Sequence, residues 1–336
     1  MSIGREGENN KGEKALPIKN ETLKMMYRKM LTIRRFEERA IREYENGNLY
    51  GFIHSYIGQE AIAVGVCSHL RIDDRIVSNH RGHGHCIAKG ADMKRMMAEI
   101  FGKKTGYCRG KGGSMHIADF KIGMLGANGI VCAGLPIATG SALAARLEGG
   151  DRISVVFFGD GACGEGEFHE SLNLASIWRL PIVFVCENNM YGVNTATSYS
   201  MAAKNVADRA AAYSMPGAVA DGNNLFTVYE TAEKAVNRAR AGKGPSLIEF
   251  KTYRWRGHFE GGGMPDLRPR DEVEEWKKKC PVAFMEQQLL EMGIMDANEL
   301  NAVNAEVMSQ VQEAVEFAIN SPLPDPEDAL EGIFSK

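Results

Sequence analysis

The sequence lacks the features that mark several large classes of protein. Its seven cysteines form no C-x-x-C pair, so neither a disulfide framework nor a zinc knuckle is indicated. The number is odd and several lie inside apolar runs, which is typical of buried thiols in a reducing compartment. No apolar stretch approaches the roughly 20 residues that cross a membrane. We therefore expect a cytoplasmic protein with no membrane partner.

The chain also has little net charge and no N-terminal targeting signal. A formal net charge of −3 over 336 residues gives no broad positive field, so nucleic acid and anionic lipid are not expected partners. Two small basic clusters, Arg109 with Lys111 and Arg254 with Arg256, suit one small anion better than a polymer. Residues 1–20 contain acidic side chains and no hydrophobic core, which excludes a signal peptide and predicts a disordered leader.

The chain does contain an alternation of helical and apolar segments. Continuous apolar runs are typical of parallel strands that are covered on both faces, and they occur at Ile153–Phe158, Ile182–Cys186 and Ser246–Phe250. Helical periodicity is found before and between these runs, at Glu21–Asn46, Gly58–His69, Glu165–Trp178 and Leu225–Ala241. Strands that alternate with helices predict an α/β fold with a mostly parallel sheet.

After Lys251 the sequence changes character. Residues 254–270 are dense in glycine and proline and have no period, which predicts an exposed and functional loop. Beyond them, apolar residues at helical spacing predict one long helix that ends at the proline-rich SPLPDPED: Leu300, Val303, Val307, Val311 and Val315. We expect residues 21–336 to form a single domain with a helical C-terminal region from about residue 271.

Polar residues follow two neighbouring predicted strands at the point where each strand ends. Gly159-Asp160-Gly161 follows the first strand, and Asn188-Asn189 follows the second, 29 residues later (189 − 160). Open α/β sheets bind ligands beyond the carboxyl ends of their strands. A carboxylate and an amide oxygen are hard ligands of the kind Mg²⁺ prefers, and glycines permit close approach of phosphate oxygens. The residues predict a divalent cation that bridges the protein to a diphosphate.

These glycine-rich stretches have other possible interpretations. A G-D-G turn suits a tight hairpin, but here a helix follows. Gly159, Gly161 and Gly164 also spell the dinucleotide pattern G-x-G-x-x-G, with Glu187 as a candidate ribose ligand. Against that interpretation, Asp160 would face a pyrophosphate with no cation between them. Residues 106–111 fall one residue short of a phosphate-binding Walker loop and lack its Ser or Thr.

At this point the motifs resemble those of a known family, the alpha subunits of the thiamine diphosphate-dependent first component of 2-oxo acid dehydrogenase complexes. The G-D-G turn and the later E-N-N-M-Y-G carry the resemblance. Further blocks occur in the same order: GFIHSYIGQEA, NHRGHGHCIAKG, GKGGSMHIAD, GANGIV and TYRWRGHFEG. Together they cover roughly residues 31–271. The resemblance implies a three-layer thiamin diphosphate-binding fold with a mostly parallel central sheet, a helical N-terminal arm and a helical C-terminal region.

The resemblance also implies the site residues. Mg²⁺ would be bound by the side chains of Asp160 and Asn189 and by the backbone carbonyl of Tyr191. The same three residues would contact thiamine diphosphate together with His80, Arg81, Gly129, Val131, Gly161, Ala162 and His258. His54 and His258 would be the catalytic residues that move protons. From the residues alone, the histidine-rich loop around Arg81 indicates an anion or metal site, and arginine suits phosphate.

Substrate and partners are implied in the same way. His80 stands where many family members have Tyr, and the histidine-rich block with TYRWRGHFEG most resembles the acetoin dehydrogenase branch. The expected function is cleavage of acetoin and transfer of the acetyl-level fragment to the lipoyl group of a partner acyltransferase. A beta subunit would complete an alpha-two beta-two enzyme. The alternatives are a pyruvate dehydrogenase alpha subunit, a nicotinamide-dependent oxidoreductase and a non-catalytic regulatory subunit.

Overall fold

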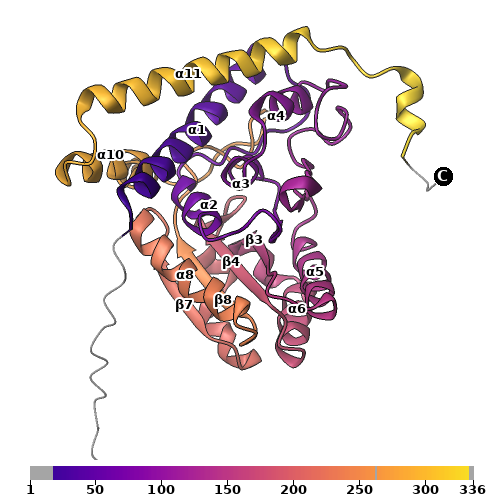
Figure 1. Ribbon diagram of the computed structural model, residues 1–336, viewed down its shortest axis with the longest axis vertical. Coiled ribbons are helices and arrows are strands. Elements are labelled where there is room, and N and C mark those ends of the chain that lie inside the picture. The colour runs from indigo at the N-terminus through magenta and orange to yellow at the C-terminus, as the bar shows by residue number, and fades with distance from the viewer. Residues whose placement is uncertain (1–17, 262, 333–336) are drawn as a thin grey trace, which may run out of the picture.

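The computed structural model describes residues 18–261 and 263–332, so all but the last three residues of the expected leader lie outside the described residues. A six-stranded parallel sheet forms the centre of the described chain, in the strand order β2-β1-β3-β4-β8-β7 (Figure 1). Its strands are β1 (Arg75–Val77), β2 (Met124–Gly126), β3 (Ser154–Gly159), β4 (Ile182–Asn188), β7 (Gly217–Asp221) and β8 (Ser246–Lys251). The three strands expected from the sequence are confirmed to within two residues at each end.

Alternate side chains of the central strands enter two separate hydrophobic cores. In β3, Val155 and Phe157 belong to one core, and Val156 and Phe158 belong to the other. Successive residues of a strand point to opposite faces, so both faces must be covered. That is why these strands read as continuous apolar runs rather than as alternating patterns.

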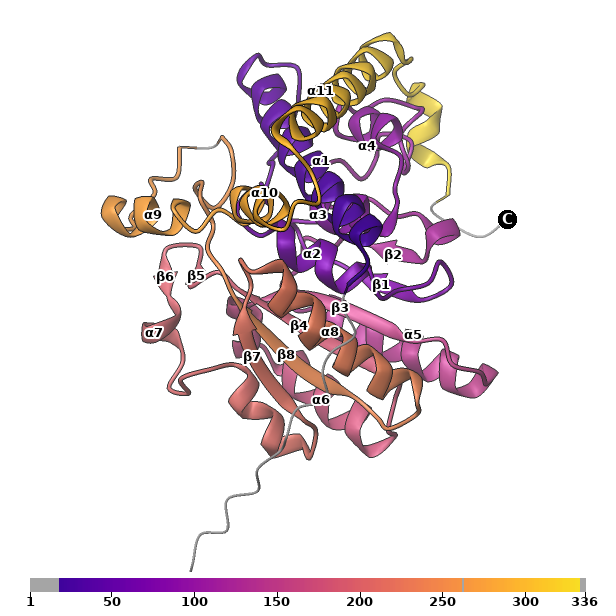
Figure 2. The same ribbon diagram turned by 60° about the vertical axis from the view of Figure 1, so that its left-hand side comes forward.

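Helices cover both faces of the sheet and confirm the three-layer α/β fold (Figure 2). One face packs against α5 (Gly134–Glu148) and α6 (Gly166–Ile177). The other packs against α2 (Glu60–Cys67) and α8 (Leu225–Arg240). A Cβ on Gly65 of α2 would lie 2.6 Å from Cγ1 of Val228 in α8, so the close approach of these two helices requires glycine.

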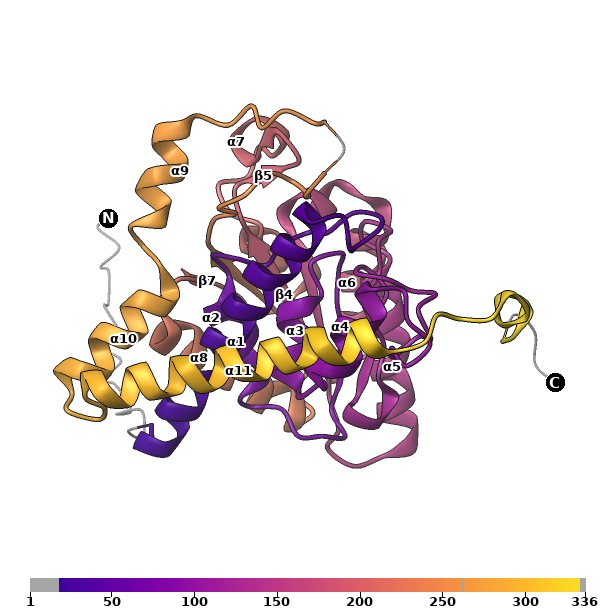
Figure 3. The ribbon, with the colours of Figure 1, turned by 90° about the horizontal axis from the view of Figure 1, so that it is seen from above.

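The N-terminal and C-terminal helices pack together beside this second face. Helix α1 (Asn20–Glu45) lies along α11 (Ala297–Asn320), as Figures 1 and 3 show. The guanidinium of Arg28 binds both carboxylate oxygens of Glu306 across this contact, at 2.5 and 2.6 Å. The remaining helices of this region are α3 (His83–Lys89), α4 (Met93–Ile100), α9 (Arg270–Lys277) and α10 (Pro281–Glu291). The expected long C-terminal helix is confirmed.

Short elements connect these layers. The hairpin of β5 (Tyr191–Gly192) and β6 (Thr195–Ala196) follows β4, and α7 (Thr197–Ser200) comes directly after it. Single 3-10 turns occupy η1 (Phe120–Ile122), η2 (Asp160–Gly164), η3 (Ala207–Tyr213) and η4 (Pro326–Leu330). Among the helices of the described ranges, none has both the length and the apolar character to cross a membrane.

The glycine-rich segment 254–270 is only partly the exposed loop that the sequence predicts. Its described part has no helix or strand before Arg270, but Arg254 is 2% exposed and Arg268 is 5% exposed. Their guanidinium groups are buried because backbone carbonyls accept from them: Arg254 donates to Val193 at 2.6 Å, and Arg268 donates to Arg256 at 2.6 Å. Arginine thus fixes the path of the segment from inside.

The structure also corrects the prediction that the basic pair Arg109 and Lys111 binds a small anion. Arg109 forms ion pairs with Asp328 and Glu331, and the Lys111 ammonium donates to the Glu331 carbonyl at 2.7 Å. These two basic residues therefore hold the C-terminal segment rather than a small anion.

The start of α11 gives a test of the C-terminal packing. Asp296 accepts from the Glu299 N–H and Glu299 accepts from the Asp296 N–H, both at 2.8 Å, which is a capping box. We expect Asp296→Ala to lower the free energy of unfolding by about 1 kcal/mol, because it leaves helix N–H groups without an acceptor. Urea unfolding measures this. The control Asn301→Ala, at an exposed position in the same helix, should cost nothing; equal effects would contradict the assignment.

Candidate active site

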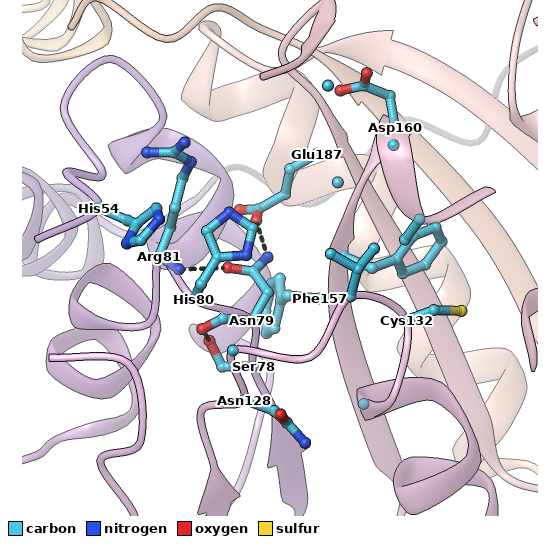
Figure 4. A pocket seen from close by; sticks show the side chains of 18 of the residues that line it. His54, Ser78, Asn79, His80, Arg81, Asn128, Cys132, Phe157, Asp160 and Glu187 are labelled. Atoms are coloured by element: carbon cyan, nitrogen blue, oxygen red, sulfur yellow. Dashed lines mark hydrogen bonds between the residues drawn. The ribbon is translucent and has the colours of Figure 1, made fainter. Parts of the chain in front are cut away.

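A cavity of about 340 Å³ opens at the carboxyl ends of β3 and β4. Figure 4 shows His54, His80 and Arg81 on one side of it and Asp160 on the other. Every residue that the sequence analysis assigns to catalysis, cofactor or metal lines this cavity: His54, His80, Arg81, Gly129, Val131, Asp160, Gly161, Ala162, Asn189, Tyr191 and His258. The fold thus brings together residues from six separate sequence blocks.

Asp160 is the first residue after β3. Strands β3 and β4 run in parallel register with Gly159 opposite Glu187, so the turn after β3 lies next to the end of β4. Burial raises the pKa of Asp160, even though the Thr197 hydroxyl, which donates to Oδ2 at 3.0 Å, and the backbone N–H of Asn189 favour its charged form. A buried carboxylate of this kind is stabilised by a cation.

Asn189 supplies a neutral oxygen next to this carboxylate. Its Nδ2 donates to Oε1 of Gln59 at 3.3 Å, while its Oδ1 is buried and has no hydrogen-bond partner among the described residues. An unpartnered buried carbonyl oxygen costs about 1–3 kcal/mol. A metal ion that accepts this oxygen as a ligand would remove that cost.

The backbone beyond Asn189 is held in a strained turn. Met190 and Val193 have φ values of 72° and 58°, in the left-handed region that side chains other than glycine rarely adopt. Such residues cost on the order of 1–3 kcal/mol each and concentrate at functional sites. Tyr191 lies between them, and its hydroxyl donates to Glu272 of α9 at 2.7 Å. The turn also approaches the G-D-G motif, since a Cβ on Gly161 would lie 3.5 Å from Cα of Gly192.

Three histidines gather on the opposite wall. His54, His80 and His258 each offer a ring nitrogen, and these nitrogens all lie within 4.8 Å of one another. The Glu260 N–H donates to the Ile53 carbonyl at 2.8 Å, which ties the loop that carries His258 to the segment that carries His54. This backbone contact explains why histidines 204 positions apart (258 − 54) meet.

Burial and the adjacent Arg81 together keep the members of this histidine cluster uncharged. The Arg81 guanidinium donates to the carbonyls of Ser55 and His258 at 3.0 and 2.7 Å, and no carboxylate of residues 18–261 or 263–332 forms an ion pair with it. Burial and the Arg81 charge lower the pKa of His54 and of His258 to about 3. The same two causes lower the pKa of His80.

The hydrogen bond from Arg81 also selects the tautomer of His258. Arg81 can only donate, and its NH2 group lies 3.2 Å from Nδ1 of His258, so Nδ1 accepts and Nε2 carries the proton. A zinc ion would need free lone pairs on all three imidazoles. The cluster is therefore suited to hydrogen bonding and proton transfer more than to holding zinc.

Three residues of the site are not predicted as site residues by the sequence. Gln59 and Thr197 contact the expected metal ligands, and the buried Arg254 lies close enough to Asp160 to affect its pKa. Gln59 lies inside the GFIHSYIGQEA block, which could have drawn attention to it. Thr197 carries no local signal, because only the β5–β6 hairpin brings it back to Asp160.

Glu187 has a different role from the one that a dinucleotide site would require. It is 2% exposed, and its carboxylate accepts from the Tyr56 hydroxyl and from His85 Nε2 at 3.0 Å. It also accepts from Asn79 Nδ2 at 3.2 Å, a hydrogen bond drawn in Figure 4. With three donors around it, Glu187 organises the histidine-rich loop and is not free to bind a ribose.

Comparison with known proteins identifies the family. The model of the dehydrogenase E1 component family matches residues 28–327. The chain belongs to this family. It is 50% identical to the alpha subunit of acetoin:2,6-dichlorophenolindophenol oxidoreductase from Bacillus subtilis (strain 168), over 99% of this chain and 97% of the relative. The corresponding subunit from Cupriavidus necator is 47% identical, over 95% and 96% of the two chains.

Pyruvate dehydrogenase alpha subunits are also related to this member of the E1 family. The E1 component subunit alpha from Porphyra purpurea is 39% identical, over 93% of each chain. The resemblance drawn from the motifs is therefore confirmed, and the chain is an alpha subunit of a thiamine diphosphate-dependent oxidoreductase. The nicotinamide alternative is wrong.

The depressed pKa values of the histidine cluster predict how stability depends on pH. The unfolded chain takes up protons on its histidines as the pH falls through about 6.5, whereas the folded protein leaves His54 and His258 neutral until about pH 3. The unfolded state thus binds more protons in this window, so we expect stability to fall as the pH drops below about 6.5.

Thermal unfolding of the cofactor-free protein between pH 7.5 and 5 measures this effect. The double variant His54→Gln, His258→Gln should lose less stability over that range than the original protein, whereas His169→Gln, at an exposed position, should behave like the original. The same pH dependence in all three proteins would rule out the depressed pKa values.

Proposed function

We propose that this E1 alpha subunit binds thiamine diphosphate through Mg²⁺ and cleaves acetoin, passing the acetyl-level fragment to the lipoyl group of a partner acyltransferase. One observation carries the proposal: the unpartnered buried Oδ1 of Asn189 lies in the same cavity as the buried carboxylate of Asp160. Among the described residues Asp160 forms no ion pair, and a carboxylate and an amide oxygen are ligand types that suit Mg²⁺.

The residues around this pair suit the rest of the cofactor. The cavity floor at Gly161 and Ala162 consists of small residues, which let backbone groups approach phosphate oxygens. The buried cations Arg81 and Arg254 add positive charge, and neither forms an ion pair within the described part of the chain. Mg²⁺ would be held by the side chains of Asp160 and Asn189 and by the Tyr191 carbonyl. Gly129 and Val131 line the wall where the aminopyrimidine ring would lie.

Thiamine diphosphate, when bound, supplies the carbanion chemistry that breaks the carbon–carbon bond of the substrate. The contribution of this chain is to orient groups and to move protons. His258 presents Nε2–H as a donor because Arg81 occupies its Nδ1. His54, whose Nδ1 is buried and has no hydrogen-bond partner among the described residues, is placed to accept a proton from a substrate hydroxyl or to return it. His80 would add a third neutral hydrogen-bonding group on the same wall.

The proposal includes a beta subunit. Glu187, a carboxylate that lines the cavity, is engaged by Tyr56, His85 and Asn79, so it is not free to activate the aminopyrimidine. Ile130 and Val131, which line the cavity, are 70% and 49% exposed, so two adjacent apolar side chains at the site face solvent. A second subunit that covers them could supply the activating glutamate, and the complete enzyme would be an alpha-two beta-two tetramer.

The choice of acetoin over pyruvate rests on the relatives. The B. subtilis and C. necator relatives are named for acetoin, and the pyruvate dehydrogenase relatives have lower identity. Pyruvate dehydrogenase activity is the second candidate.

The substrate is tested with the chain copurified with its beta subunit. Reduction of 2,6-dichlorophenolindophenol should occur with acetoin, should require both Mg²⁺ and thiamine diphosphate, and should be weaker with pyruvate and with branched 2-oxo acids. The isolated chain should be inactive because its site is incomplete. A higher kcat/KM for pyruvate would replace the acetoin assignment, and robust lipoyl acylation by the isolated chain would remove the beta subunit from the proposal.

Asp160 is tested by a near-isosteric change. Asp160→Asn keeps the size of the side chain but removes the charge on the expected ligand, so we expect it to lower the affinity for Mn²⁺, used in place of Mg²⁺, by about a hundredfold or more and to abolish dye reduction. Electron paramagnetic resonance measures free Mn²⁺ directly. Asp73→Asn, an exposed change, serves as the control. Unchanged Mn²⁺ affinity in Asp160→Asn would disprove the metal assignment.

A further inference from the structure

Gln59 occupies a position in the cavity that helix geometry alone does not explain. It is the residue before the first turn of α2, where a side chain commonly caps the helix, yet its side chain makes no capping hydrogen bond. Its backbone is fixed on both sides, since its N–H donates to the Tyr56 carbonyl at 3.1 Å and its carbonyl accepts from Ile62 at 3.0 Å. The side chain is completely buried and lines the cavity.

Within the described chain, the oxygen of the Gln59 side-chain amide is hydrogen-bonded, whereas its nitrogen is not. Oε1 accepts from Nδ2 of Asn189 at 3.3 Å. Nε2 is buried and has no partner among the described residues, as is also true of Oδ1 of Asn189. The two amides thus make one bond and leave one donor and one acceptor unpaired in the same cavity. Each unpaired group is unfavourable until a ligand arrives.

The direction of the Gln59–Asn189 hydrogen bond decides which atom of the Asn189 side-chain amide faces the cavity. If both amides were flipped, the bond would survive, but Asn189 would turn its NH₂ group toward the position expected for the cation. With Oε1 of Gln59 as the acceptor, Asn189 instead keeps its carbonyl oxygen free. An oxygen is a ligand for Mg²⁺, whereas an NH₂ group is not.

We propose that Gln59 is a binding residue of the cofactor site with two functions: its Oε1 fixes the Asn189 amide so that Oδ1 faces the cation, and its Nε2 donates to an oxygen of the bound metal–diphosphate unit. This inference rests on the proposed function, because it needs a cation and an anionic oxygen in the same cavity. The unpaired donor and the unpaired acceptor have the chemistry that a metal-bound diphosphate complements.

Two substitutions separate the two functions. Gln59→Glu retains an acceptor for Asn189 Nδ2, so the Asn189 oxygen still faces the cation, but it has no NH₂ group and places a negative charge beside the diphosphate. Gln59→Met has a similar length and removes both groups. Gln287→Met, at an exposed glutamine that donates to Glu291 in α10, is the matched control.

The measurements use the assembled complex with its beta subunit. We expect Gln59→Glu to keep Mn²⁺ affinity and to lose thiamine diphosphate affinity by about tenfold or more, since one charge-assisted hydrogen bond is lost and a repulsion is added. Gln59→Met should weaken both by about tenfold. Mn²⁺ binding is followed by electron paramagnetic resonance, and thiamine diphosphate binding by calorimetry.

A purely structural role for Gln59 would give a different result. Gln59→Met removes the unpaired Nε2 but also takes away the acceptor of Asn189 Nδ2, so we expect a modest fall in the unfolding temperature of the cofactor-free complex. The rise on adding Mg²⁺ and thiamine diphosphate should also become smaller, whereas a purely structural role would leave that rise unchanged. Original affinities in Gln59→Met would overturn the inference, as would equal loss of Mn²⁺ affinity in Gln59→Glu and Gln59→Met. If the original complex binds neither Mn²⁺ nor thiamine diphosphate, it is the proposed function that fails.

Discussion

The parallel pairing of β3 with β4 is the constraint on which the site depends. Because Gly159 lies opposite Glu187, the first residues beyond each strand, Asp160 and Asn189, are brought to the same edge of the sheet. A slip of one residue would turn Val155 and Phe157 into the opposite core, so the packing of both hydrophobic layers fixes this register. The stability of the sheet and the spacing of the expected metal ligands are thus set by the same contacts.

Much of this arrangement could be predicted from the sequence because it depends on local patterns. The apolar runs located β3, β4 and β8, and the rule that ligands bind at the carboxyl ends of strands located Asp160 and Asn189. The parts that were missed depend on contacts between distant segments. Arg254 and Arg268 were expected on an exposed loop, since glycine and proline density cannot reveal that backbone carbonyls accept from both guanidinium groups inside the protein.

Thr197 also could not be predicted, because its role again depends on a contact between segments that are separated in the sequence. Thr197 reaches Asp160 only because the β5–β6 hairpin reverses the chain, and that hairpin depends on Met190 and Val193 adopting positive φ without glycine. The tertiary fold must impose such a conformation, because local preference opposes it. The basic pair Arg109 and Lys111 indicated an anion site because no acidic residue lies next to the pair in the sequence. In the structure the C-terminal segment returns to this pair and supplies its partners.

Charge separation across the cavity connects these observations with the proposed chemistry. Asp160 and Asn189 present oxygens on one side, whereas Arg81 holds three neutral imidazoles on the other. An anionic diphosphate near Arg81 would offset its charge, which is the second cause of the lowered pKa of His54 and of His258 after burial, and would move both pKa values upward. Cofactor binding would then prepare the proton-transfer groups as well as supply the reactive carbon.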